Sequence, residues 1–137
     1  MADLHTEGLQ YLLEVGFSEE QSVPANFYVG LCTDTSLAED ASLGDQTEVT
    51  GTGYARQTIA SNNTDITSAA TGAADWKITT KEVTFTAGGT WDGAKTVFLA
   101  TSNDDSGKLI ASVALSETRT LNDGDSLTLS IEIDLTG

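Results

Sequence analysis

Polar and apolar residues alternate through the last segment of the chain, from Asp125 to Thr136. Successive side chains of a β-strand point to opposite faces, so such a segment has one apolar face and one polar face. One-sided strands of this kind are typical of antiparallel sheets that cover a core, whereas parallel sheets contain continuous apolar runs. The pattern predicts a final strand whose buried face carries Leu127, Leu129, Ile131, Ile133 and Leu135.

Earlier strands are predicted between clusters of turn-forming residues. They cover residues 26–32, 54–61, 76–86, 95–101 and 108–115. The run 95–101 is apolar on both faces, which favours a central position in a sheet. Residues 103–107 and 121–125 are rich in Asp, Asn and Gly and predict the turns before the last two strands. Between these elements we expect a long loop at 33–44 and irregular structure at 62–74.

The N-terminal segment has a helical rather than an alternating pattern. Apolar residues from Leu4 to Val15 lie near helical spacing, and Gly16 is placed to end a short helix there. This helix either closes one end of the β body or forms an arm that docks on a neighbouring subunit. Pro24 restricts the backbone just before the first long strand. We therefore divide the chain into an N-terminal helix and arm, residues 1–24, and a β-sandwich domain, residues 25–137.

Short strands separated by turn residues at this spacing are typical of a sandwich or a jelly roll. The expected fold class is therefore mainly β: an antiparallel β-sandwich, jelly-roll-like, with a short N-terminal helix. A chain of 137 residues is long enough for one domain with a real core. Since β-sandwiches perform many unrelated functions, this fold class does not indicate a function by itself.

Charge narrows the classes of partner. The chain contains 21 Asp and Glu residues against six Lys and Arg, which gives a formal net charge of -15. Such a surface repels the phosphates of nucleic acids and the headgroups of anionic lipids, so we expect neither nucleic acid nor membrane as a partner. No apolar run approaches a membrane span, and residues 1–5 do not resemble a signal peptide, so we expect synthesis in the cytoplasm.

Side chains suited to catalysis or metal binding are few. His5 is the only histidine and Cys32 the only cysteine, so a histidine-based zinc site is excluded and a Cys–His pair requires these two to meet. His5 lies near the N-terminus, where chains fray, and Cys32 lies in an apolar strand, which favours a buried thiol over a nucleophile. The acidic turns at 103–105 and 122–125 offer oxygen ligands for Ca²⁺ but do not match its twelve-residue loop, so we interpret them as turn formers. We predict no catalytic residue, no cofactor and no metal.

Two segments of the chain have distinctive sequences. Ala25–Asp34 contains Tyr-Val-Gly-Leu-Cys-Thr, and Thr47–Gln57 contains Glu-Val-Thr-Gly-Thr-Gly-Tyr-Ala-Arg-Gln. They resemble a family of small structural proteins of tailed bacteriophages, in which Tyr-Val-Gly-Leu-Phe-Thr is followed by Glu-Val-Ser-Gly-Gly-Gly-Tyr-Ala-Arg-Gln. Cys32 stands where Phe is expected, and Thr52 where Ser or Gly is common. The later Ala-Asp-Trp at 74–76 is also similar, and the second segment is the specific one.

This resemblance implies a non-enzymatic virion structural protein. Its leading form is a capsid decoration or cement protein, located on the capsid surface, that binds the outside of the major capsid shell and stabilises it. The implied partners are the major capsid protein and further copies of the chain, in a homodimer or homotrimer. Related sequences are also labelled as tail or tail-fibre proteins, so the alternative is a tail or tail-fibre component that binds a receptor or a glycan.

Candidate interface residues come from the helix and from the specific segment: Leu4, Leu9, Tyr11, Leu12, Tyr54 and Arg56. Arg56 is one of two arginines on an acidic chain, so it is expected to pair with a carboxylate. That carboxylate belongs either to the chain itself, as Glu48 does, or to a partner. Trp76 and Trp91 either pack in the core or provide platforms on which sugar rings stack.

Overall fold

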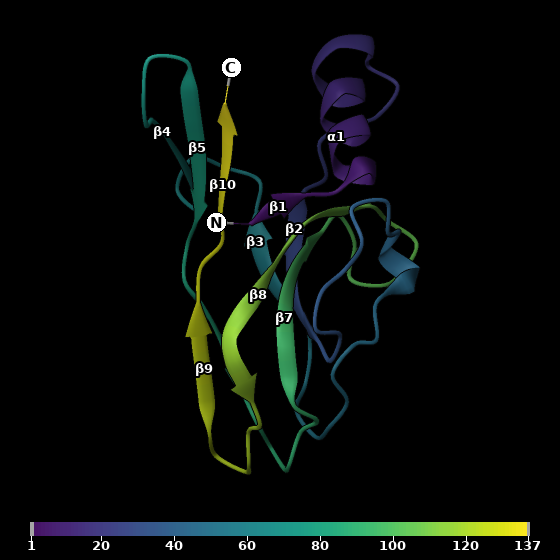
Figure 1. Ribbon diagram of the computed structural model, residues 1–137, viewed down its shortest axis with the longest axis vertical. Helices are drawn as coiled ribbons and strands as arrows, with labels where there is room; N and C mark the ends of the chain where they lie inside the picture. Colours follow the sequence, from purple (N-terminus) through teal and green to yellow (C-terminus); the bar gives the residue numbers. More distant parts are fainter. Residues whose placement is uncertain (1, 137) are drawn as a thin grey trace.

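The computed structural model describes residues 2–136 and consists mainly of antiparallel strands with one short N-terminal helix (Figure 1). Residues 1 and 137, the outer ends of the two predicted domains, lie outside the described residues. The elements, in chain order, are β1 (Asp3–Leu4), α1 (Thr6–Leu13), the π-helical turn η1 (Glu14–Ser18), β2 (Asn26–Cys32), the 3-10 turn η2 (Leu43–Asp45), β3 (Gln57–Ala60), β4 (Ile66–Ala70), β5 (Asp75–Thr80), β6 (Val83–Thr86), β7 (Ala94–Ala100), β8 (Leu109–Arg119), β9 (Ser126–Leu129) and β10 (Glu132–Thr136).

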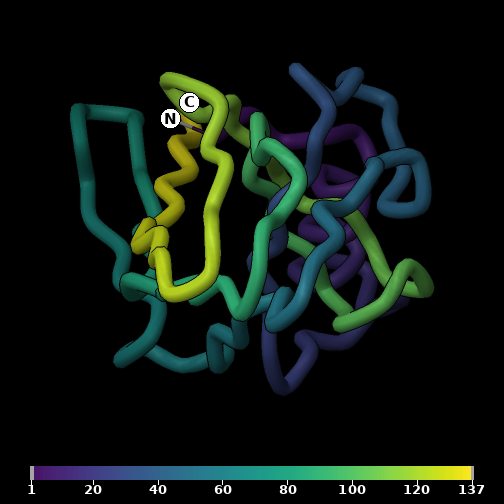
Figure 2. The backbone as a smooth tube through the Cα atoms, turned by 90° about the horizontal axis from the view of Figure 1, so that it is seen from below, coloured from purple at the N-terminus to yellow at the C-terminus, as the bar shows by residue number. Residues whose placement is uncertain are grey.

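The strands of the described chain form three antiparallel sheets. A five-stranded sheet has the order β1-β8-β7-β2-β3, a three-stranded sheet the order β10-β5-β4, and β6 pairs with β9. The two smaller sheets follow one another along one side of the large sheet (Figure 1), and Figure 2 shows the β4–β5 and β9–β10 segments beside the β7–β8 segment from another direction. This arrangement confirms the predicted mainly β, antiparallel, sandwich-like fold, but it does not confirm the jelly-roll arrangement.

The central strand β7 is buried on both faces, as its apolar run predicted. It pairs with β2 on one side and with β8 on the other. On its inner face, Val97 and Leu99 belong to the main core between the two layers. On the outer face, Phe98 packs in a second cluster with Leu43, so the long loop predicted at 33–44 closes the back of the large sheet.

The alternating C-terminal segment forms two strands rather than one. The alternation of burial is real up to Ile133, but β9 pairs with β6 whereas β10 pairs with β5. The predicted strand 76–86 breaks at the same level, between β5 and β6. Thr80, at the end of β5, is hydrogen-bonded to Ile131, between β9 and β10. Its N–H donates to Ile131 O over 2.9 Å, and its hydroxyl accepts the N–H of Ile131 over 2.9 Å. The chain therefore changes pairing partner where the sequence indicated continuous strands.

Two further expectations were wrong. The helix does not end at Gly16, because η1 continues it to Ser18 and Glu19 ends it with a left-handed φ of 57°. Residues 62–74 are not irregular throughout, because β4 lies within them and pairs with β5 along its whole length. Small polar and Ala residues leave no apolar alternation in β4, so its pairing partner rather than its own pattern makes it a strand.

The boundary at residue 24 stays a prediction. The segment before it is joined closely to the β body: β1 pairs with β8, and the side chain of Tyr11 on α1 is buried. Gly8 allows this contact, because a Cβ atom at this position would collide with the backbone of Ile110 in β8.

Candidate functional site

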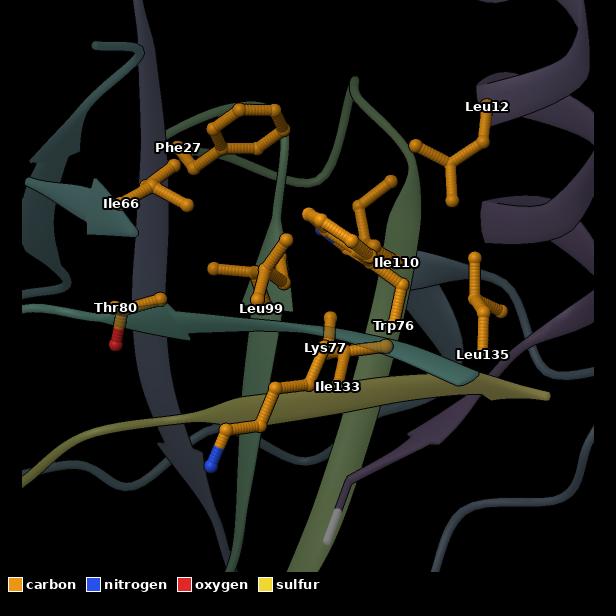
Figure 3. Close-up of a pocket in the computed structure, with 11 residues that line it drawn as sticks. Leu12, Phe27, Ile66, Trp76, Lys77, Thr80, Leu99, Ile110, Ile133 and Leu135 are labelled. Carbon is orange, nitrogen blue, oxygen red and sulfur yellow. The ribbon is translucent and has the colours of Figure 1, made fainter. Parts of the chain in front are cut away.

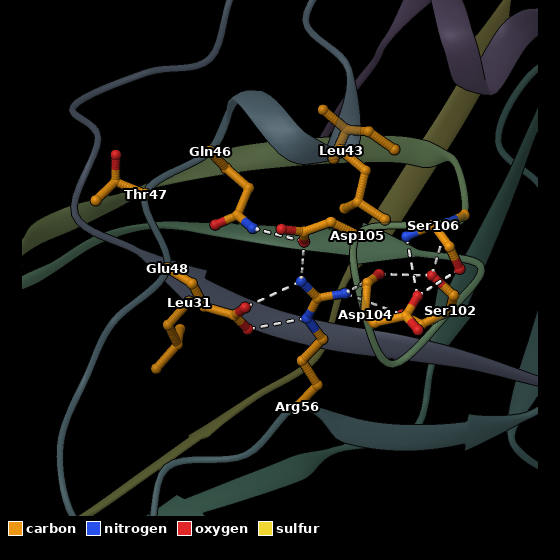
Figure 4. A network of polar contacts seen from close by, with 12 residues as sticks. Leu31, Leu43, Gln46, Thr47, Glu48, Arg56, Ser102, Asp104, Asp105 and Ser106 are labelled. Atoms are coloured by element: carbon orange, nitrogen blue, oxygen red, sulfur yellow. Dashed lines mark hydrogen bonds and ion pairs between the residues drawn. The ribbon is translucent and has the colours of Figure 1, made fainter.

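Arg56 lies just before β3, and its guanidinium is almost completely buried in a network of carboxylates (Figure 4). Its Nε donates to Glu48 Oε2 and its Nη2 to Glu48 Oε1, both over 2.9 Å, which makes a two-pronged ion pair. Nη2 also donates to Asp105 Oδ1 over 2.7 Å. Burial alone lowers the pKa of Arg56, but the bonds to Glu48 and Asp105 outweigh burial, so the pKa is raised above its ordinary value.

The remaining donors of Arg56 bind the turn between β7 and β8. Nη1 donates to Ser102 O over 3.0 Å and to Asp104 O over 2.7 Å. The guanidinium also lies over the ring of Phe98, 5.1 Å from its centroid. A guanidinium has five N–H donors, and each has an acceptor within the chain. Of the two alternatives for Arg56, the structure therefore bears out the pair with Glu48 of the same chain.

Tyr54 completes this network from the side of the core. Its hydroxyl donates to Glu48 Oε2 over 2.6 Å and accepts the N–H of Leu31 over 2.9 Å. Its ring stacks on Phe85 and meets Trp91 edge-on, with centroid distances of 6.1 and 5.4 Å. Burial, and then the hydrogen bond to Glu48, raise the pKa of Tyr54, so the phenol stays neutral. The specific sequence segment is thus a joint that ties β2, β3 and the 102–106 turn together.

The glycine at the start of this joint makes room for a tryptophan. Gly51 has a φ of 153°, and a Cβ atom there would collide with the indole ring of Trp91. Trp91 is buried and donates from Nε1 to Thr52 O over 2.8 Å. Of the two alternatives for Trp91, the structure therefore shows core packing.

The other tryptophan belongs to a surface of exposed apolar side chains. Trp76 on β5 is 55% exposed, and it lies opposite the half-exposed Leu135 in the register of β5 and β10. The helical segment adds Phe17, which is 84% exposed, and three leucines. Leu9 and Leu13 are four residues apart, a spacing that places side chains on one helix face. We call this set the apolar surface: Leu9, Leu12, Leu13, Phe17, Trp76 and Leu135.

A cavity of about 180 Å³ is lined by α1 and by strands of both the five-stranded and the three-stranded sheet (Figure 3). Figure 3 shows Leu12 and Leu135 on one side, Phe27 and Ile66 on the other, and the Trp76 ring between them. The remaining lining residues are Lys77, Ile78, Thr80, Leu99, Ile110 and Ile133. An almost wholly apolar lining suits an apolar side chain, and it lacks the convergent polar groups that fix a polar ligand.

Of the six predicted interface residues, two are exposed and four are buried or partly buried. Leu9 and Leu12 lie on the apolar surface, whereas Tyr54 and Arg56 lie in the buried network. Leu4 is partly buried in β1, and Tyr11 is buried, with its hydroxyl donating to Ser22 O over 2.6 Å. An interface role for these residues stays a prediction. Leu13 and Phe17 are exposed as well and were detectable from their spacing after Leu9. The prediction that Leu135 lies on a buried face was wrong, because it is 50% exposed.

The residues considered for chemistry are engaged in structure. His5 is buried rather than frayed, and its ring bonds Ala38 O over 2.9 Å and Ser112 Oγ over 2.7 Å instead of meeting Cys32. Cys32 is fully buried, and this burial raises the pKa of its thiol to about 12, as expected for a core residue. Within residues 2–136, no three His, Cys, Asp or Glu side chains gather to hold a metal ion. None of the helices described is long and apolar enough to cross a bilayer.

The acidic turns use their carboxylates to close the backbone. Asp104 Oδ1 accepts the N–H of Ser106 over 2.9 Å, and Asp125 Oδ2 accepts the N–H of Asn122 over 3.0 Å. The hydrogen bonds from Ser106 hold the pKa of Asp104 below its ordinary value. These bonds agree with the interpretation of both segments as turn formers.

Comparison with known families gives one result. Residues 10–135 match the Gp80 family, described as podophage GP4 fiber I protein gp80. A comparison with curated proteins gives no match. The matched region contains the whole buried network and every member of the apolar surface except Leu9. The match confirms the predicted resemblance, and the chain belongs to the Gp80 family of tailed-phage structural proteins.

Proposed function

We propose that the protein is a non-enzymatic structural subunit of a phage fibre, and that it attaches to another virion protein through the apolar surface. The observation that carries this proposal is the match of residues 10–135 to a family described as a fiber protein. Membership of that family supports a place in the virion. The position in a fibre and the means of attachment are what the proposal adds.

The apolar surface supports attachment by burial. Three members of the apolar surface, Leu12, Trp76 and Leu135, line the same cavity. Covering exposed apolar side chains removes apolar area from water at about 25 cal/mol per Å². Phe17 and Trp76 supply large aromatic groups of the kind that dominate binding energy at protein interfaces. Elsewhere in the β body, the network of Arg56 and Tyr54 joins β2, the segment before β3 and the 102–106 turn. The apolar lining of the cavity favours a protein side chain over a sugar as the occupant.

The second candidate is the role that the motif resemblance implied, a decoration protein on the outer surface of the major capsid shell. The segments Ala25–Asp34 and Thr47–Gln57 favour it, because the resembling proteins include capsid decoration proteins. In this role, copies of the chain form a homodimer or homotrimer, and many weak contacts together retain it on the shell. The same apolar surface serves either location.

Copy number in the particle tests the two locations. We would purify virions and measure the ratio of this protein to the major capsid protein by quantitative mass spectrometry, with gold-labelled antibody to locate it by electron microscopy. A fibre subunit gives few copies and label at the tail or neck. A decoration protein gives copies comparable with the capsid subunit and label over the head. Absence from purified virions contradicts both roles.

A further inference from the structure

The residues that frame the apolar surface are acidic. The helical segment 6–20 carries four glutamates and no lysine or arginine. On β5 and β10, the carboxylates alternate with the apolar side chains and therefore point to the opposite face of the sheet. We call the three glutamates on the segment that carries Leu13 and Phe17 the acidic rim: Glu14, Glu19 and Glu20.

The chain has little positive charge left to neutralise this rim. Lys77, the lysine beside the cavity, is paired with Glu132 over 3.5 Å. Lys108 lies 3.7 Å from Glu7, which also accepts two backbone N–H groups. The other paired cations also bind carboxylates outside the rim: Arg56, Lys81 and Arg119. Glu14, Glu19 and Glu20 lie on the helical segment that carries Leu13 and Phe17, and within residues 2–136 no lysine or arginine forms an ion pair with them.

We infer that the apolar surface receives an amphipathic segment of another virion protein, whose apolar side chains cover the surface and whose lysines or arginines meet the acidic rim. This inference rests on the proposed function. A second copy of the chain fits less well, since it brings the same net charge of -15 and the same rim. Facing rims repel each other within the Debye length of about 8 Å at physiological ionic strength.

The shape of the surface fits a helical or extended segment with regularly spaced apolar residues. Leu9, Leu13 and Phe17 are each four residues apart and form a ridge along α1 and η1. The cavity of about 180 Å³, which Leu12 of the same helix lines, offers a place for one large apolar side chain. An apolar cavity of about 150 Å³ is known to hold a benzene ring, so the available volume suits a side chain of aromatic size.

Two synthetic amphipathic peptides test the charge of the partner. Both have the same length and leucine pattern, and the polar positions are lysine in one peptide and glutamate in the other. Trp76 reports binding by a blue shift of its fluorescence, while buried Trp91 supplies a constant background. We expect the leucine–lysine peptide to bind at least ~10-fold more tightly, with an affinity that falls as salt rises.

Matched protein variants separate the rim from the overall charge. The rim variant carries Glu14→Gln, Glu19→Gln and Glu20→Gln. The control variant carries Glu82→Gln, Glu117→Gln and Asp123→Asn, which change the net charge equally at exposed positions outside the rim. We expect the rim variant to lose about tenfold in affinity for the lysine peptide, as the loss of three exposed ion pairs predicts, and the control to lose less than about twofold.

Three results overturn the inference. Equal losses of affinity in the two variants mean that only the overall charge of the protein matters. Equal affinities for the two peptides mean that the rim does not favour a cationic partner. Sedimentation equilibrium of the protein alone tests for a dimer. If a dimer forms and Phe17→Ser dissociates it, a second copy occupies the surface. Each of these results leaves the copy number in virions unchanged, so failure of this inference is distinguishable from failure of the proposed function.

Discussion

Replacing Arg56 with methionine tests whether the buried network stabilises the fold. Methionine keeps the length and the apolar stem of the side chain but removes every donor of the guanidinium. Glu48 then loses both of its bonds to Arg56 and retains the hydrogen bond from Tyr54. The 102–106 turn loses the donor that bound Ser102 O and Asp104 O.

The expected cost follows from the burial of the partners. The side chain of Arg56 is 3% exposed and that of Glu48 is 26% exposed, so the carboxylate is left largely desolvated. Removing one partner of a buried ion pair costs about 3–5 kcal/mol, because the other charge stays uncompensated. This is about a fifth or more of the roughly 5–15 kcal/mol that stabilises a typical domain. For a chain of this size, the loss lowers the melting temperature by about 10–20 °C.

Arg119 provides a matched control, because it is the only other arginine of the chain. Its side chain is 46% exposed and pairs with the exposed Glu117 over 3.0 Å. Exposed pairs contribute about 0–1 kcal/mol, so Arg119→Met should change stability little. Urea unfolding of both variants, followed by tryptophan fluorescence and by circular dichroism, measures the difference between them.

A double-mutant cycle then tests coupling. Glu48→Gln removes the charge that Arg56→Met leaves unpaired, so the double variant should be less destabilised than the sum of the single ones by about 1–3 kcal/mol. Asp105 contacts the same guanidinium, but its side chain is 55% exposed, so Asp105→Asn should cost less than Glu48→Gln. The reasoning is refuted if Arg56→Met costs no more than Arg119→Met, or if the costs at Arg56 and Glu48 simply add.

Three further predictions concern other parts of the chain. Gly51→Ala should destabilise the protein by about 1–3 kcal/mol in urea unfolding, because the new methyl group collides with Trp91 and the φ of 153° disfavours a side chain. Lys81 holds the pKa of Asp65 below its ordinary value of 3.8. The ionised Asp65 therefore stabilises the fold at pH values above the pKa of Asp65 in the unfolded chain, and this stabilisation is lost as the pH falls through its pKa in the folded protein. In thermal melts, Asp65→Asn should make the decrease of the melting temperature at acid pH less steep. Phe17→Ser should change stability by less than about 0.5 kcal/mol, because Phe17 is 84% exposed, yet lower incorporation into virions measured by mass spectrometry.

The fold was predictable where local pattern and tertiary environment agree. β7 is apolar on both faces and is central, and the Asp- and Asn-rich segments are turns. Prediction failed where pairing overrides pattern. The alternation that ends at Thr136 continues through a change of sheet at Ile131, and alternation alone contains no signal for such a change. β4 has no apolar alternation and depends on its pairing with β5.

The candidate site was predictable only in part, because exposure of an apolar side chain is a tertiary property. The spacing of Leu9 and Leu12 indicated a helix face, but not whether that face is buried or open. Tyr11 lies next to Leu12 in the sequence and is buried, whereas Leu12 is exposed. Trp76 and Trp91 had the same two alternatives in the sequence. Trp91 is buried because its ring packs against Gly51 and Tyr54 and its Nε1 donates to Thr52 O, and these contacts come from the tertiary structure.

The segment that carries the sequence resemblance and the surface that we propose for attachment are separate parts of the molecule. Glu48, Tyr54 and Arg56 direct their polar groups to one another and to neighbouring backbone, so they have no donor to offer a partner. Their recurrence in a relative therefore indicates the same fold rather than the same binding partner. A relative that keeps these three residues but replaces Phe17 and Trp76 with polar ones should fold alike and attach differently, because the apolar area that drives attachment is lost while the joint between the strands is intact.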